Sequence, residues 1–145
     1  MIRPINPTDR DAWGELFTAY GVFYETSFTP EVLDKVWALM QDPASGIDAL
    51  VAEQDGDAVG FAHYRSHPDT FTGARDWFLD DLYVSVDARG AGHATALIEH
   101  IADLARAGDN GGTLRWITAA DNARAQHLYD HIAIKTDWVM YEKRF

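Results

Sequence analysis

The chain has 145 residues, no cysteine and a formal net charge of −11. This length suits one domain with its own core, and the lack of cysteine excludes disulfides, thiolate metal sites and a cysteine nucleophile. The acidic balance argues against binding to nucleic acid or to an anionic membrane, because like charges repel. It favours a small cationic amine as substrate, although a charge spread over the surface for solubility would give the same total.

The sequence shows no targeting pattern and no membrane-spanning pattern. Its start lacks the apolar stretch of a signal peptide, and no apolar run approaches the roughly 20 residues needed to span a bilayer. It also shows no repeat and no linker. We therefore expect a single domain over residues 1–145, located in the cytoplasm.

The first half of the chain alternates apolar patterns with turn signals, which predicts three strands and two helices. The strands are expected at residues 2–6, 47–54 and 58–67. The hydroxyl of Thr8 would cap the first helix, and the second would begin at Pro30, where a missing N–H costs nothing. The first helix carries an apolar stripe made of Trp13, Leu16, Phe17, Tyr20 and Phe23.

The second half alternates strands with helices. The expected elements are a strand at 78–86, a turn at 87–92, a helix at 93–107 that ends in 108–112, a strand at 114–119, a helix after Asp121 or Asn122, and a last strand at 134–145. The order β, α, α, β, β, β, α, β, α, β predicts an α/β fold, a mixed sheet with helices on both faces.

The strongest local signal is the strand, turn and helix around residues 82–94. Gly90 and Gly92 let the backbone turn tightly and leave room for a ligand to approach the amides. The first N–H groups of the following helix have no intrahelical partner and form an anion site, where Arg89 adds a permanent positive charge. This arrangement suits a pyrophosphate, although a glycine-containing turn of this kind is often only a turn.

The order of elements and the segment Arg89-Gly90-Ala91-Gly92-His93-Ala94 resemble the Gcn5-related N-acetyltransferase (GNAT) superfamily. Its acetyl-CoA signature is Q/R-x-x-G-x-G/A, and Arg89, Gly92 and Ala94 fill the specified positions. A later Asn-x-x-Ala-x-x-Leu-Tyr pattern stands at residues 122–129. The resemblance implies a single-domain, mixed but mostly antiparallel sheet flanked by helices on both faces, and acetyl-CoA as co-substrate.

The resemblance also implies which residues hold acetyl-CoA. Backbone groups at the end of the strand would pair with the pantetheine arm as an added strand does, and the amides of the turn would cradle the pyrophosphate. Asn122 would contact the cofactor or order the last helix. The cofactor-binding residues are therefore expected to be Leu82, Val84, Val86, Arg89, Gly90, Ala91, Gly92, His93, Ala94 and Asn122.

Acetyl transfer to an amine requires a neutral amine, a polarised carbonyl and a proton for the leaving thiolate. Without cysteine, direct attack in a ternary complex is the simpler route. The resemblance places Tyr129 near the thioester sulfur, where it could act as general acid; the alternative is a core tyrosine. An alkylammonium has a pKa of about 10.4, so a base is needed. The candidates are Asp81, taken as catalytic, Asp80 and Glu25.

The acceptor site is expected to involve Tyr24, Glu25, Asp80 and Trp77. The first two lie in the loop between the first helices, a region that lines the acceptor site in this family. Trp77 could attract a cation through its ring. The segments 79–84 and 137–141 resemble the subgroup that acetylates polyamines, histone tails or small amino compounds. The chain departs from the family at Ala133, where a typical member has glycine.

Two other classes of function stay open. One is a CoA-binding sensor or partner-binding module without turnover, and the other is a nucleic-acid-binding domain, which the net charge disfavours. The family resemblance also favours a homodimer, in which the last strand pairs between subunits. His127 and His131 stand four residues apart and could bind a metal, but surface histidines are expected, and no metal site is predicted.

Overall fold

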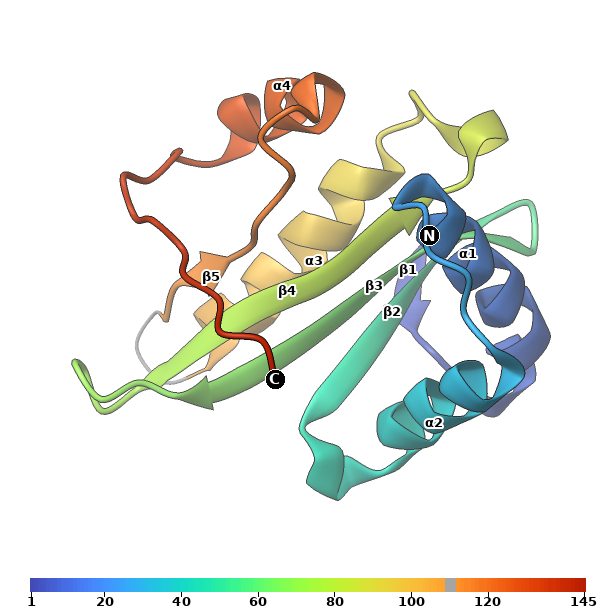
Figure 1. Ribbon diagram of the computed structural model, residues 1–145, viewed down its shortest axis with the longest axis horizontal. Coiled ribbons are helices and arrows are strands. Elements are labelled where there is room, and N and C mark those ends of the chain that lie inside the picture. Colours follow the sequence, from blue (N-terminus) through green and yellow to red (C-terminus); the bar gives the residue numbers. More distant parts are fainter. Residues whose placement is uncertain (109–111) are drawn as a thin grey trace.

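The computed structural model describes residues 1–108 and 112–145 (Figure 1). Within these residues, five strands form one sheet in the order β1-β2-β3-β4-β5. They are β1 (Ile2–Pro4), β2 (Ile47–Gln54), β3 (Asp57–Pro68), β4 (Arg75–Val84) and β5 (Leu114–Arg115). The first four are antiparallel to their neighbours, and β5 is parallel to β4. The predicted mixed, mostly antiparallel α/β sheet is confirmed.

Helices cover both faces of this sheet, as predicted (Figure 1). They are α1 (Arg10–Phe23), α2 (Pro30–Gln41), α3 (His93–Ala107) and α4 (Ala123–Ile132). On one face, Trp13 and Phe17 of α1 and Trp37 of α2 pack around Phe61 of β3. On the other face, the apolar stripe of α3 packs on alternate residues of β2, β3 and β4, and Tyr129 of α4 joins the same cluster.

The first helix begins with a cap different from the one predicted. Asn6, not Thr8, accepts an N–H with its side chain, and Asp9 accepts the N–H of Asn6 at 2.8 Å, which completes a capping box. The prediction of Thr8 as the cap is wrong because a short 3₁₀ turn over Pro7–Asp9 precedes α1. Thr29 caps α2 with Pro30 at its first position, as expected.

The strand β4 ends at Val84, and the prediction that it continues to Val86 is wrong. The N–H of Ser85 still bonds to Val59 of β3 at 2.8 Å, but Ala88 and Arg89 then donate back to Ser85 and Val86. These bonds close a 3₁₀ turn over residues 86–88 and turn the side chain of Val86 into solvent, with 65% of its surface exposed.

The strands β4 and β5 pair only briefly. Two registered pairs join them, Trp77 with Leu114 and Phe78 with Arg115. The predicted strand over 114–119 is therefore too long, because beyond Arg115 the two strands part. The remainder of β4, as far as Val84, keeps its pairing with β3, and no strand of the described residues pairs with its other side. This open edge of β4 positions the site described below.

The segment after α4 forms no helix and no strand, so the prediction of a last strand over 134–145 is wrong. Its run of large apolar residues, Trp138 to Tyr141, is typical of a strand, but the segment pairs with none of the strands that the structure describes. Trp138, Val139 and Tyr141 are exposed in consequence.

At the end of α3, the N–H of Gly108 bonds to Leu104, while the rest of the predicted end, residues 109–111, lies outside the described residues. No helix among the described residues combines the length and the apolar character needed to cross a bilayer.

Candidate active site

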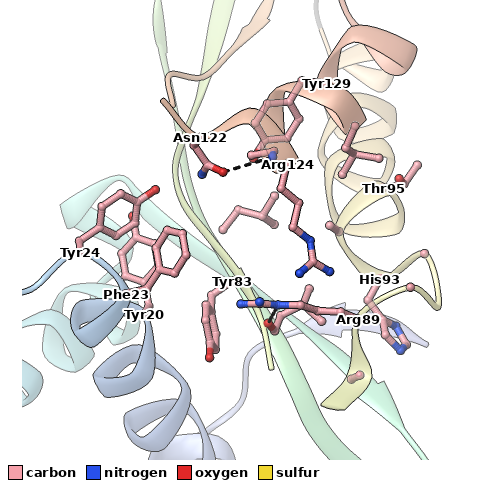
Figure 2. Close-up of a pocket in the computed structure, with 18 residues that line it drawn as sticks. Tyr20, Phe23, Tyr24, Tyr83, Arg89, His93, Thr95, Asn122, Arg124 and Tyr129 are labelled. Carbon is pink, nitrogen blue, oxygen red and sulfur yellow. Dashed lines mark hydrogen bonds between the residues drawn. The ribbon is translucent and has the colours of Figure 1, made fainter. Parts of the chain in front are cut away.

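A cavity of about 380 Å³ lies where β4 and β5 part, between α1, the start of α3 and the start of α4 (Figure 2). Its walls come from four elements: α1 and its end (Tyr20, Phe23, Tyr24), β4 (Leu82, Tyr83, Val84), the turn into α3 (Ala88, Arg89, Gly90, Gly92, His93, Ala94, Thr95) and the start of α4 (Asn122, Arg124, Ala125, Leu128, Tyr129). Segments far apart in the sequence thus meet in one hollow.

The turn into α3 presents backbone amides to this cavity. Gly90 and Gly92 have φ angles of 84° and 83°, in the left-handed region that favours glycine. A Cβ on either would meet nothing within 4 Å, so backbone conformation, not crowding, requires glycine here. The first bond of α3 runs from Ala96 to Gly92, and the amides before Ala96 lack intrahelical partners. They form a site suited to an anion.

Two arginines add positive charge to the same cavity. Arg89 donates from Nε to the carbonyl oxygen of Val84 at 3.2 Å. Arg124, from the start of α4, extends across the cavity toward Arg89 (Figure 2). Among the described residues, neither guanidinium forms an ion pair with a carboxylate. Two cations facing one hollow repel each other, so a bound polyanion such as a pyrophosphate would relieve that repulsion.

The open edge of β4 can pair with an extended ligand. The N–H of Ser85 points to β3, and the C=O of Val84 points the opposite way, toward Arg89. Because a strand residue turns its N–H and C=O to the same edge, the N–H of Val84 faces the cavity side. By alternation, the N–H of Leu82 does the same. These two predicted residues therefore lie as a pantetheine site requires, whereas Val86 does not.

Tyr129 and Asn122 come to the cavity from α4. The ring of Tyr129 packs edge-on against Trp116 at 5.4 Å, and burial raises the pKa of its phenol. The phenol therefore keeps its proton at neutral pH. Asn122 lines the cavity and also caps α4, accepting the N–H of Ala125 at 3.2 Å. Of the two roles that the resemblance allowed for Asn122, ordering the helix is the one visible in its hydrogen bonds.

The opposite wall is aromatic. Tyr20 and Tyr24 meet edge to face at 5.0 Å, and the hydroxyl of Tyr20 donates to Asp81 at 2.8 Å. Asp81 itself does not line the cavity. Burial raises its pKa, but hydrogen bonds from His63 and Tyr20 outweigh that effect and hold the pKa below its ordinary value. Asp81 is therefore a stable carboxylate that reaches the cavity through Tyr20.

Several predicted residues lie away from the cavity. Glu25 is exposed in the turn after α1, and Asp80 pairs with Arg65 at 3.0 Å on the surface. Trp77 stacks on Tyr64 at 6.0 Å, where β4 pairs with β5. Val86, Ala91 and Asp81 are the other predicted residues that do not line the cavity.

Sequence reasoning did not assign several of the lining residues to the site, among them Tyr20 and Arg124. Tyr20 was taken as part of the apolar stripe of its helix, and nothing local distinguishes it from a core residue. Arg124 stands inside the segment 122–129 that carries the family resemblance, so its charge could have been noted there.

Comparison with known proteins agrees with this geometry. Residues 11–133 match the sequence model of the family described as Acetyltransferase (GNAT) family. The chain belongs to this family. It is 36% identical to the D-amino-acid N-acetyltransferase HPA3 of Saccharomyces cerevisiae, an alignment that covers 99% of this chain and 89% of the yeast protein.

Solved structures show the same fold. A ribosomal-protein-alanine N-acetyltransferase from Brucella melitensis biovar Abortus 2308 is 30% identical with a TM-score of 0.84, over 100% of this chain and 99% of that chain. A structure of AAC(6')-Iy in complex with the bisubstrate analogue CoA-S-monomethyl-acetylneamine has a TM-score of 0.81 at 20% identity, over 100% of this chain and 97% of that chain, and shows likeness of fold alone.

The protein is thus an N-acetyltransferase of a family that uses acetyl-CoA as co-substrate. The predicted enzyme class is confirmed. The predicted likeness to polyamine and histone acetyltransferases stays a prediction, because the named relatives act on other amines.

Proposed function

We propose that the protein transfers the acetyl group of acetyl-CoA to the primary amine of a small amino compound by direct attack within a ternary complex. One observation carries this proposal: an anion-binding helix start, an open strand edge and a protonated phenol border a single cavity of about 380 Å³. The helix start would bind the cofactor, the strand edge would orient the carbonyl group, and the phenol would supply a proton.

The residues at the phosphate end fit the co-substrate. The amides of Gly92, His93 and Ala94 would bind the pyrophosphate together with the guanidinium groups of Arg89 and Arg124. Gly90 and Ala91 form the turn that leaves these amides accessible. The open edge of β4 would take the pantetheine arm as an added strand, which orders the flexible arm toward Tyr129.

When bound, acetyl-CoA supplies an acetyl group activated as a thioester. The N–H of Val84 would donate to the carbonyl oxygen of that group, which favours attack on its carbon. The ammonium would first lose a proton to water, and the neutral nitrogen would then form the C–N bond. As the C–S bond breaks, Tyr129 would give its proton to the sulfur, and the second proton lost by the nitrogen would return through water to the phenolate. A thiol has a pKa of about 8.5 and a phenol one of about 10. The phenol is the weaker acid of the two and burial raises its pKa further, so it would act by donating to the sulfur while negative charge develops there.

The acceptor would enter along the aromatic wall, where Phe23 and Tyr24 lie (Figure 2). The net charge of −11 supports a cationic amine. Amino acids are the first class to test, because the yeast relative is named a D-amino-acid N-acetyltransferase. Polyamines and basic peptides are the next classes. Glu25, Asp80 and Trp77 lie outside the cavity and have no part in this proposal.

The test is release of CoA thiol from acetyl-CoA with a panel of D- and L-amino acids, polyamines, lysine peptides and aminoglycosides. Tyr129→Phe should lower kcat about 100-fold, the lower end of general acid catalysis. Tyr64→Phe, which removes a hydroxyl from the buried face under α3, is the matched control and should change little. Absence of release with every amine, or equal kcat in the two variants, would contradict the proposal.

A homodimer is part of the same proposal. The exposed residues Trp138, Val139, Met140 and Tyr141 support it, because large apolar side chains are normally covered. Light scattering after size exclusion should give twice the chain mass of 16.2 kDa. Trp138→Glu together with Tyr141→Glu should then give a monomer. A monomeric wild-type protein would rule the dimer out.

A further inference from the structure

A buried chain of hydrogen bonds links the core to the wall of the cavity. The indole Nε1–H of Trp13 donates to His63 Nε2 at 2.8 Å, and His63 Nδ1 lies 2.9 Å from Asp81 Oδ2. The other oxygen, Asp81 Oδ1, accepts the hydroxyl of Tyr20 at 2.8 Å. Trp13 is fully buried and His63 is 3% exposed, so water does not compete for the inner bonds.

Trp13 sets the direction of every bond in this chain. An indole N–H donates and cannot accept, so His63 Nε2 must accept. The neutral ring then carries its proton on Nδ1 and donates it to Asp81. Both carboxylate oxygens accept, and the Tyr20 hydroxyl therefore donates a hydrogen bond to Asp81 and keeps its proton. The lone pairs of the Tyr20 oxygen remain free for another donor.

The free end of the chain faces the cavity. Tyr20 lines the cavity, whereas the other three residues do not. Burial and the neighbouring Asp81 raise the pKa of Tyr20 well above its ordinary value. Tyr20 therefore keeps its proton, directed to Asp81, and its oxygen can accept from a ligand in the cavity that Tyr129 also lines.

We propose that Tyr20 binds the acceptor amine by accepting one of its N–H groups at the phenolic oxygen. Trp13, His63 and Asp81 form a positioning chain, because they act on the amine only through Tyr20. This inference rests on the proposed acetyl transfer and specifies the chemistry of the acceptor. An N–H group can donate to the phenolic oxygen of Tyr20, whereas a carbonyl or carboxylate oxygen would be repelled by the lone pairs of that oxygen.

The same geometry changes the role expected of Asp81. An alkylammonium has a pKa of about 10.4, whereas the pKa of Asp81 lies below 3.8. A proton on the amine has no tendency to move to such a weak base. Asp81 instead supplies a lasting negative charge behind Tyr20, which favours a cationic amine and fixes the direction of the hydroxyl.

Steady-state kinetics with acetyl-CoA and one accepted amine, run on the full chain, can test this. Tyr20→Phe should raise the KM of the amine about tenfold, the value of one lost charge-assisted hydrogen bond, with little change in the KM of acetyl-CoA. Asp81→Asn should have at least that effect, because Asn must turn its oxygen to His63 and its NH₂ to Tyr20. The Tyr20 hydroxyl would then point into the cavity as a donor.

His63 provides the test of positioning. His63→Leu should raise the KM of the amine as Tyr20→Phe does, whereas His63→Gln can still accept from Trp13 and donate to Asp81 and should restore most of the loss. Tyr64→Phe, one residue away on the opposite face of β3, is the matched control and should leave both KM values unchanged. The melting temperature with and without CoA reports separately on folding and on the cofactor site.

The outcomes separate this inference from the proposed function. Amine KM values that rise in Tyr20→Phe and Asp81→Asn, with rescue in His63→Gln, support it. Wild-type turnover together with an unchanged amine KM in Tyr20→Phe overturns the inference and leaves acetyl transfer intact. Should the wild type acetylate no amine, both fail. If His63→Leu does not fold, the two variants at Tyr20 and Asp81 still decide.

Discussion

The two walls of the cavity differ in the groups that form them, mainly backbone in one and side chains in the other. The cofactor wall is mainly the continuous stretch 89–95, with its backbone amides and two glycines with φ near 84°, and Arg124 adds a second guanidinium to that of Arg89. The acceptor wall is made of side chains that meet from distant positions: Tyr20 and Asp81 are 61 residues apart, and Trp13 and His63 are 50 apart.

This difference determines how each wall can be damaged. A backbone wall depends on local conformation, so a single residue that cannot adopt it affects cofactor binding for every acceptor. A wall of hydrogen-bonded side chains can lose one bond at a time, and each loss should affect the acceptor without affecting acetyl-CoA. Variants that separate the two KM values therefore test whether the walls act independently.

The largest effect is expected at the phosphate end of the cofactor wall. Replacing Arg89 and Arg124 together by Gln should raise the KM of acetyl-CoA about 100-fold, since a contact between an arginine and a phosphate contributes about 1.5 kcal/mol. Acetyl-pantetheine has no phosphate, so its KM should stay the same in this variant. A similar rise for both donors would show that the arginines shape the wall and do not bind phosphate.

A smaller effect is expected from the conformation of the turn. Gly92→Ala places a side chain in a left-handed residue, which costs about 1–2 kcal/mol, and should raise the KM of acetyl-CoA about tenfold. Gly46, with φ 74° and equally open surroundings, is a matched control far from the cavity. Gly46→Ala should lower the melting temperature to a similar extent without changing either KM. Equal KM values in the two variants would contradict a role of the turn in binding.

The sequence predicted the cofactor wall because its signals are local. Two glycines, one arginine and a capped helix stand within a few residues of each other, so their spacing alone indicates their geometry. Tyr20 could not be recognised in this way, because its partner Asp81 is 61 residues away and its neighbours are core aromatic residues. The function of such a side chain follows from tertiary packing, which no local pattern describes.

The predictions of the strand ends were wrong for a related reason. Apolar and aromatic residues predict an extended segment, but a strand also requires pairing with a neighbour. Residues 114–119 and 134–145 carry such residues and still pair little or not at all: β5 pairs with β4 at two registered positions, and residues 134–145 join no described strand. The misjudged strand ends thus coincide with the opening that forms the site.

The pH dependence of kcat/KM should show, without any substitution, whether the amine or a group of the enzyme titrates. The pKa of Asp81 is lowered from 3.8 and that of Tyr129 is raised from 10.0, so neither group changes charge between about pH 5 and pH 9. Over this range kcat/KM should rise with pH only as the amine loses its proton. With two amines of different pKa, the rise should move with the amine. A limb that stays at the same pH for both would indicate a titrating enzyme group.

The smallest effect on activity is expected from Asp9, which touches neither wall. Its carboxylate closes the capping box of the 3₁₀ turn before α1 and accepts from Arg3 at 2.7 Å, and these bonds lower its pKa below 3.8. A lowered folded-state pKa means that the stabilisation is fully present above the unfolded-state value and is lost as the pH falls through the folded-state value. Asp9→Asn should therefore lower the free energy of unfolding by about 1–3 kcal/mol at pH 7. The difference from the wild type should shrink as the pH falls below 3.8 and through the lowered folded-state pKa, while both KM values stay unchanged. Urea titrations at neutral pH and at this lower pH measure the stability, and a changed KM would show that the scaffold under α1 controls the acceptor wall.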